Sequence, residues 1–222
     1  MRIPAPHGHL EAHLRPASLP PRGAAVLCHP HPLHGGTMHT KAVFRSAQAL
    51  SDAGFHVLRF NFRGVGHSTG SYDHGQGEMD DVRAALDWME AEYPELPLLV
   101  GGFSFGSVVG LRTGLADPRV RAFLALGLPV RTFELGDLRK AKVSEARPLL
   151  LVQGEDDEFG NGAEAEAFAR HLGSGATVIR VPGADHFFHD HFDELRAAIT
   201  DFFTEGPGRE PFSPLAGARS DA

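Results

Sequence analysis

The sequence predicts a single α/β domain built on a mostly parallel β-sheet with helices on both faces. Three observations point to this fold class. Short, almost wholly apolar runs are bounded by glycine and proline, longer amphipathic stretches lie between them, and the length of 222 residues suits one domain. Because the runs lack alternating polar residues, their strands are expected to be buried on both faces, as strands of parallel sheets are.

Five apolar runs are interpreted as buried strands, and a sixth segment is added to them. They are residues 24–28, 55–60, 98–102, 120–126 and 148–153, with 177–181 as the sixth. Residues 8–15 alternate polar and apolar side chains, which is typical of an antiparallel strand at the edge of a sheet. Apolar residues at spacings of three and four predict helices over residues 40–53, 78–92, 104–115, 163–171 and 190–203.

The domain is expected to cover residues 1–204. The remaining segment, 205–222, is rich in proline, glycine, serine and charge, and such a composition favours a disordered tail without function.

Charge and cysteine content exclude several classes of partner and location. The formal net charge is −7, so the clustered Lys and Arg that nucleic acids or anionic membranes require are not expected. A single cysteine, Cys28, cannot form an internal disulfide, which suits a reducing compartment. No apolar stretch reaches the length of a membrane span, and the first residues lack the apolar segment of a signal peptide. A cytoplasmic protein is expected.

The most informative motif is G-x-S-x-G at residues 102–106, between a predicted strand and a predicted helix. The chain turns sharply at such a junction, so small residues are needed two positions either side of Ser104. The serine is then presented at the carboxyl edge of the sheet, beside the amino end of a helix, where developing negative charge is favoured. The alternative is a plain structural role in which Ser104 caps the helix, so the presence of partner residues decides between the two.

A serine nucleophile needs a histidine base, and the base needs a carboxylate to fix its tautomer. The carboxylate is expected after the strand at 148–153, where residues 155–158 are all acidic. Asp157 is our choice and Asp156 its rival, although any of these acids could instead belong to a solvated turn.

The base is expected to be His186. It follows the last predicted strand and precedes the last predicted helix, so the chain order is Ser, Asp, His, as in the nucleophile-elbow template. The chain contains 14 histidines, most of which must be bystanders. His189 and His191 compete for the role, but they fall inside or against the last predicted helix.

Two backbone N–H groups are expected to stabilise a tetrahedral oxyanion. One belongs to Phe105, the residue after the serine, and the other to the loop after the strand at 24–28. Because Pro30 and Pro32 have no N–H, His31 is the expected donor, with Leu33 as the alternative. A stiff turn without catalytic function is the structural alternative for this loop.

The same loop also spells H-x-H-x-x-H at residues 29–34, a pattern that suits zinc or iron. Metallo-hydrolases with a similar start carry an aspartate just before the third histidine, and Leu33 stands there instead. A serine mechanism with no metal or cofactor is therefore expected.

Together with the motif at Ser104, the stretches C-H-P-H-P-L-H-G-G-T-M-H-T-K and R-G-V-G-H-S resemble small α/β-hydrolases related to dienelactone hydrolase and to CocE-type or prolyl-peptidase-like esterases. The resemblance covers most of residues 20–204 and implies the α/β-hydrolase fold. Dienelactone hydrolases themselves use a cysteine at the elbow, so Ser104 argues against lactone specificity. Cap domains of the superfamily enter before the strand at 148–153, where only a short segment is available.

These expectations combine into a serine hydrolase with an open site that cleaves carboxylic esters of small or extended substrates. Ser104 attacks the ester, His186 transfers the proton, and Asp157 orients His186. A small-molecule ester is the expected partner. The alternatives are a peptidase or thioesterase with the same triad, a histidine-loop metallo-hydrolase, and a binding protein without catalysis.

Overall fold

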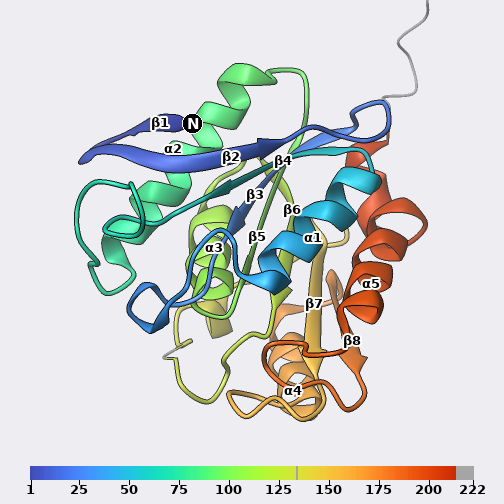
Figure 1. Ribbon diagram of the computed structural model, residues 1–222. Helices are drawn as coiled ribbons and strands as arrows, with labels where there is room; N and C mark the ends of the chain where they lie inside the picture. The colour runs from blue at the N-terminus through green and yellow to red at the C-terminus, as the bar shows by residue number, and fades with distance from the viewer. Residues whose placement is uncertain (134, 214–222) are drawn as a thin grey trace, which may run out of the picture.

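The computed structural model describes residues 1–133 and 135–213, and within these residues eight strands form one sheet in the order β1-β2-β4-β3-β5-β6-β7-β8 (Figure 1). Strands β3 to β8 run parallel, whereas β2 is antiparallel to both β1 and β4. The strands are β1 (Arg2–Ala5), β2 (Gly8–Arg15), β3 (Gly23–Cys28), β4 (Phe55–Phe60), β5 (Leu98–Phe103), β6 (Val120–Leu126), β7 (Leu149–Gly154) and β8 (Ala176–Val181). The predicted mostly parallel sheet is confirmed. Residues 8–15 form the expected antiparallel strand, but this strand is not the edge, because β1 pairs with its outer side.

Helices cover both faces of the sheet, as predicted. Those on one face are α2 (Gln76–Glu92), α3 (Phe105–Ala116) and α4 (Gly162–Leu172); those on the other are α1 (Lys41–Asp52) and α5 (Phe192–Thr204) (Figure 1). Short 3₁₀ helices lie at η1 (Pro32–His34), η2 (Leu138–Lys140) and η3 (Pro207–Phe212). Every residue of the central strands β3, β5 and β7 is buried, and successive side chains of β3 enter the two opposite core layers in turn. This double burial explains why the runs are continuously apolar.

Strand β1 is absent from the sequence prediction. It pairs antiparallel with β2, with Ile3 opposite Leu10, and forms one edge of the sheet. Pro4 lies in its middle, and a proline is tolerated at an edge because no neighbouring strand needs its missing N–H.

The expectation of a disordered tail from residue 205 is wrong for residues 207–212, which form η3. Phe212 is buried to 2% exposure, and its ring packs edge-on against Phe55 and Phe203, with centroid distances of 4.7 and 6.3 Å. Burial of one large aromatic side chain outweighs the disorder that the surrounding proline and glycine favour. The rest of the predicted tail, residues 214–222, lies outside the described residues.

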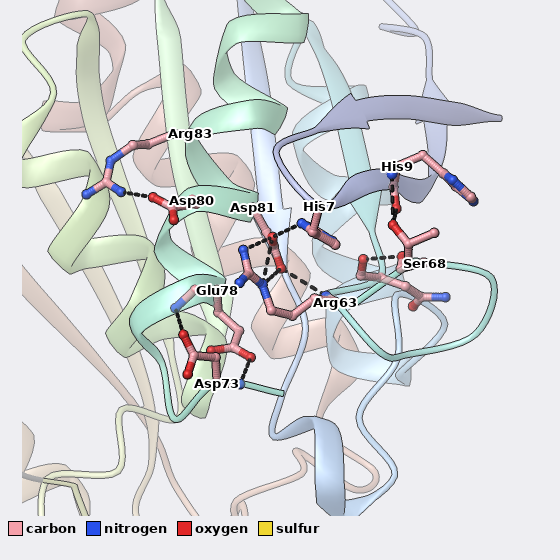
Figure 2. A network of polar contacts seen from close by, with 12 residues as sticks. His7, His9, Arg63, Ser68, Asp73, Glu78, Asp80, Asp81 and Arg83 are labelled. Atoms are coloured by element: carbon pink, nitrogen blue, oxygen red, sulfur yellow. Dashed lines mark hydrogen bonds and ion pairs between the residues drawn. The ribbon is translucent and has the colours of Figure 1, made fainter. Parts of the chain in front are cut away.

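The loop after β4 is fixed to α2 by a buried ion pair. Arg63 donates through its backbone N–H, Nε and Nη2 to the Asp81 carboxylate at 2.8–3.2 Å, and His7 approaches the same carboxylate at 3.6 Å (Figure 2). The fully buried carboxylate of Glu78 accepts the N–H groups of Asp73 and Gly75, which closes the loop onto the start of α2. These contacts give a defined position to the loop, which carries Tyr72 toward the carboxyl edge of the sheet.

No helix in the described part of the chain is both long and apolar enough to span a membrane.

Candidate active site

The turn between β5 and α3 places Ser104 at the carboxyl edge of the sheet in a strained conformation. Its φ is 55° and its ψ is −122°, a backbone region that side-chain-bearing residues rarely adopt. The two glycines of the motif make this turn sterically feasible. A Cβ on Gly102 would lie 2.3 Å from the Gly106 carbonyl oxygen, and a Cβ on Gly106 would lie 2.4 Å from that of His29. The close approach of backbone on both sides is the physical reason for the G-x-S-x-G spacing.

Gly106→Ala is therefore expected to destabilise the fold strongly and to remove activity. The added methyl group has only backbone as its neighbour, and backbone cannot move aside without disturbing β3 and its loop. We expect a loss of several kcal/mol, or no folded protein, in urea titrations. Gly110→Ala, in the same helix, is the matched control: its Cβ would have a nearest neighbour at 3.5 Å, so stability should stay equal or rise by about 1 kcal/mol. Equal stability of the two variants would contradict this account of the turn.

The structure brings together the three side chains that the sequence singled out. The Oγ of Ser104 lies 2.9 Å from Nε2 of His186, and Nδ1 of the same ring lies 2.7 Å from Oδ2 of Asp157. His186 and Asp157 are buried, at 3% and 1% exposure, whereas Ser104 is half-buried. A carboxylate on Nδ1 fixes the tautomer in which Nε2 accepts a proton from the serine hydroxyl.

The rival residues are engaged elsewhere. Asp156 is exposed, and its backbone N–H donates to the Ala184 carbonyl. His189 is exposed and contacts Asp185 at 2.6 Å, while His191, just before α5, lies 3.5 Å from Glu194. The arrangement favours Asp157 and His186 over these alternatives.

Aromatic rings enclose the imidazole of His186. Its centroid lies 5.0 Å from that of Phe103, 4.5 Å from Phe159 and 5.2 Å from Phe187. Gly127, after β6, completes the enclosure, because a Cβ there would lie 3.2 Å from Nδ1 and Cε1 of the ring. The ring is thus held between apolar neighbours while its two nitrogens face Asp157 and Ser104.

The loop after β3 lies beside the residue that follows Ser104. The His31 ring contacts the Phe105 ring at a centroid distance of 5.0 Å, and its Nδ1 accepts the N–H of Leu33 at 3.2 Å. The Leu33 N–H is thereby occupied, which leaves His31 as the better of the two backbone donors considered from the sequence. Phe105 is the first residue of α3, so its N–H has no partner within the helix. Two backbone donors near the serine are the requirement for holding an oxyanion.

The first histidine of the H-x-H-x-x-H pattern is committed to the backbone. His29 is fully buried; its Nδ1 donates to the Pro30 carbonyl at 2.6 Å, and its Nε2 accepts the Phe62 N–H at 3.0 Å. Burial lowers the pKa of His29 to about 4. Among the residues that the structure describes, no three or more His, Cys, Asp or Glu side chains gather as a metal ion would require. The described residues around this loop therefore do not provide the set of ligands that a metal site would need.

This histidine predicts a loss of stability in acid. Between about pH 6.5 and 4 the unfolded chain takes up a proton on His29 that the native protein does not, so the free energy of unfolding falls as the pH is lowered through this window. A shift from 6.5 to about 4 corresponds to roughly 3 kcal/mol, fully present above pH 6.5. Urea titrations from pH 4 to 8 measure it. His29→Gln, whose amide can also accept and donate, should show a flatter profile by about this amount; parallel profiles would contradict the assignment.

Two contributors to the site carry no sequence signal strong enough to have been predicted. Gln153, a buried polar residue at the end of an apolar run, donates to Asp157 at 2.8 Å. Tyr72, from the loop after β4, places its hydroxyl 3.2 Å from Nε2 of His31. The only available signal was the amide of Gln153 within an otherwise apolar strand; the contact of Tyr72 depends on tertiary packing.

Residues 20–132 match the family model described as serine aminopeptidase, S33. An uncharacterised protein of Rickettsia prowazekii is 34% identical over 203 residues, a match that covers 89% of this chain and 85% of that protein. The chain belongs to this family of α/β serine hydrolases.

Solved structures of related proteins agree with this assignment. An α/β serine hydrolase homologue from Coxiella burnetii is 36% identical, with a TM-score of 0.83 over 90% of this chain and 94% of that one. A lidless α/β serine hydrolase from Xanthomonas campestris is 32% identical, with a TM-score of 0.85 over 96% and 94%. The α/β-hydrolase fold without a large cap domain is thus confirmed: between β6 and β7 the described residues contain only the short helix η2.

Proposed function

We propose that this α/β serine hydrolase cleaves carboxylic esters through Ser104, His186 and Asp157. The observation that carries the proposal is that His186 contacts both of the other residues. Its Nε2 lies 2.9 Å from Oγ of Ser104, and its Nδ1 lies 2.7 Å from Oδ2 of Asp157. Nucleophile, base and orienting acid stand in hydrogen-bond reach of one another, which is the arrangement that activates a serine hydroxyl.

In the proposed reaction, Oγ of Ser104 attacks the ester carbonyl while Nε2 of His186 takes the hydroxyl proton. Asp157 holds the tautomer and stabilises the imidazolium. The negative oxygen of the tetrahedral intermediate accepts hydrogen bonds from the N–H groups of Phe105 and His31. The intermediate collapses, and the alcohol leaves with the proton from His186. Water, activated by the same histidine, then releases the acid from Ser104.

The mouth of the site supports an open, apolar substrate region. Leu33, in the loop after β3, is 67% exposed, and Phe187, whose ring contacts that of His186, is 43% exposed. Exposed large apolar side chains beside a reactive centre favour contact with apolar substrate groups. The hollow of about 600 Å³ between β1 and α2, lined by Trp88 and Arg83 among others, lies on a different part of the molecule.

Hydrolysis of an amide is the second candidate, since the matching family model is described as a serine aminopeptidase. The same nucleophile, base and oxyanion donors would serve it. Assays with p-nitrophenyl esters and aminoacyl p-nitroanilides separate the two activities, and we expect the esters to be the better substrates.

The proposal is tested by treating the wild-type protein with a fluorophosphonate probe and following p-nitrophenyl acetate hydrolysis in the same samples. We expect one adduct by intact mass, located on Ser104 by peptide mass spectrometry, and loss of turnover in step with labelling. Neither adduct nor turnover in folded protein, or an adduct on another residue, would overturn the proposed function.

A further inference from the structure

Gln153 connects three segments of the chain behind the reactive centre. It lies near the end of β7 with no exposed surface. Its Oε1 accepts the N–H of Leu128, just after β6, at 2.8 Å. Its Nε2 donates to Oδ2 of Asp157 at 2.8 Å and to the carbonyl of Gly160 at 2.5 Å. One amide on β7 therefore fixes the turn that carries Asp157 to the segment just after β6.

The contact to Asp157 involves the same oxygen that faces His186. Oδ2 accepts hydrogen bonds from both Gln153 and His186, while Oδ1 accepts the N–H of Phe159 at 2.8 Å. A buried carboxylate needs such donors to remain ionised, and their directions set the orientation of the carboxyl plane. Gln153 supplies a side-chain donor besides the histidine itself.

We propose that Gln153 is a positioning residue for the reaction: its amide holds Oδ2 of Asp157 on Nδ1 of His186 and sets the pH at which the pair becomes competent as a base. The inference rests on the proposed function of Ser104, His186 and Asp157.

The direction of the pH effect follows from the charge of the pair. The pair carries one negative charge when His186 is neutral and none when it is protonated. A donor to Oδ2 stabilises the negative state more than the neutral one. Loss of this donor therefore raises the pH at which the pair gives up its proton, and the acidic limb of kcat/KM moves upward.

Other charged groups near the pair are unaltered by a change at Gln153. Arg131, from the segment after β6, interacts electrostatically with Asp157 and binds Glu164 at 2.8 Å. Asp185, beside His186, is paired with His189. The neighbouring acids 155, 156 and 158 are half-buried or exposed. A shift in the limb thus reports the amide itself.

The experiment compares wild-type protein with Gln153→Met and Gln153→Glu, measuring kcat and KM for p-nitrophenyl acetate from pH 5 to 9. Methionine keeps the length but donates nothing, and we expect kcat to fall about 10- to 100-fold, KM to stay within about twofold, and the limb to rise by about one pH unit. Glutamate keeps the acceptor for the Leu128 N–H and adds a second carboxyl group beside Asp157, so its limb should rise further. Because Gln153→Glu keeps the contact with Leu128, its pH profile tests the inference if Gln153→Met does not fold.

Glu158→Gln is the matched control, since it changes an exposed residue of the same turn and should leave the limb in place. If the folded variants have a lower kcat but the acidic limb of kcat/KM stays at the wild-type pH, Gln153 has only a structural role. That result would overturn this inference and leave the proposed function standing. A wild-type protein that forms no adduct at Ser104 would overturn the proposed function and this inference with it.

Discussion

Ser104→Ala is expected to lower kcat for ester hydrolysis by about 10⁵-fold or more and to abolish fluorophosphonate labelling. The hydroxyl lies 2.9 Å from Nε2 of His186, so its removal leaves a base without a nucleophile. Residual turnover would come from water activated by His186 and from the oxyanion donors. Substrate binding is expected to change little, because Ser104 is half-buried and alanine leaves the surrounding backbone intact.

Ser46→Ala serves as the control for this prediction. Ser46 is a buried serine of α1 that donates to the Ala42 carbonyl, on the opposite face of the sheet from α3. It should keep both labelling and turnover. A Ser104→Ala protein with more than a tenth of wild-type kcat would require another nucleophile.

Asp157→Asn is expected to lower kcat by about 10³- to 10⁴-fold, whereas Asp156→Asn should stay within about twofold of wild type. In the Asp157 variant, Gln153 and Phe159 still present donors to the two ends of the side chain. Either orientation of the new amide therefore sets its NH₂ group against one of these donors. If the amide NH₂ faces His186, Nδ1 must accept, Nε2 carries the proton, and the ring cannot receive the proton of Ser104. Asp156 is exposed and has no comparable position.

These two variants are compared at equal folded fraction, measured by urea titration, because removal of a buried carboxylate also alters stability. The reverse order of activity, with Asp156→Asn the more damaged, would assign the acid to Asp156 and contradict the geometry.

The sheet could be predicted because its strands are buried on both faces. Runs such as the one that forms β3 have no polar residue to compete with burial, and glycine or proline at their ends limits their length. β1 was missed because it has four residues and contains Pro4, a pattern that resembles a loop until it is paired with β2. η3 was missed because one buried aromatic residue, Phe212, decides its position against the composition of its neighbours.

The three candidate residues of the site could be predicted because each follows a strand in a fixed order along the chain. Local sequence favoured Asp157 but left Asp156 as its rival, since adjacent acids in a turn differ only in the direction of their side chains. The contacts of Gln153 with Leu128 and of Tyr72 with His31 join residues far apart in sequence, and no local spacing encodes them. Such contacts depend on how the loops pack once the sheet has formed.

The packing of Phe212 also decides how the protein is best attached to a solid support. Phe212 contacts Phe55 and lies against Gly23, the first residues of β4 and β3, whereas Ser104 follows the last residue of β5. The last described residues therefore lie at the end of the sheet opposite the serine. Coupling to a bead or sensor chip on the C-terminal side of residue 213 should leave Ser104 facing the solution. Truncation at residue 204 would instead remove the buried Phe212 ring from the core.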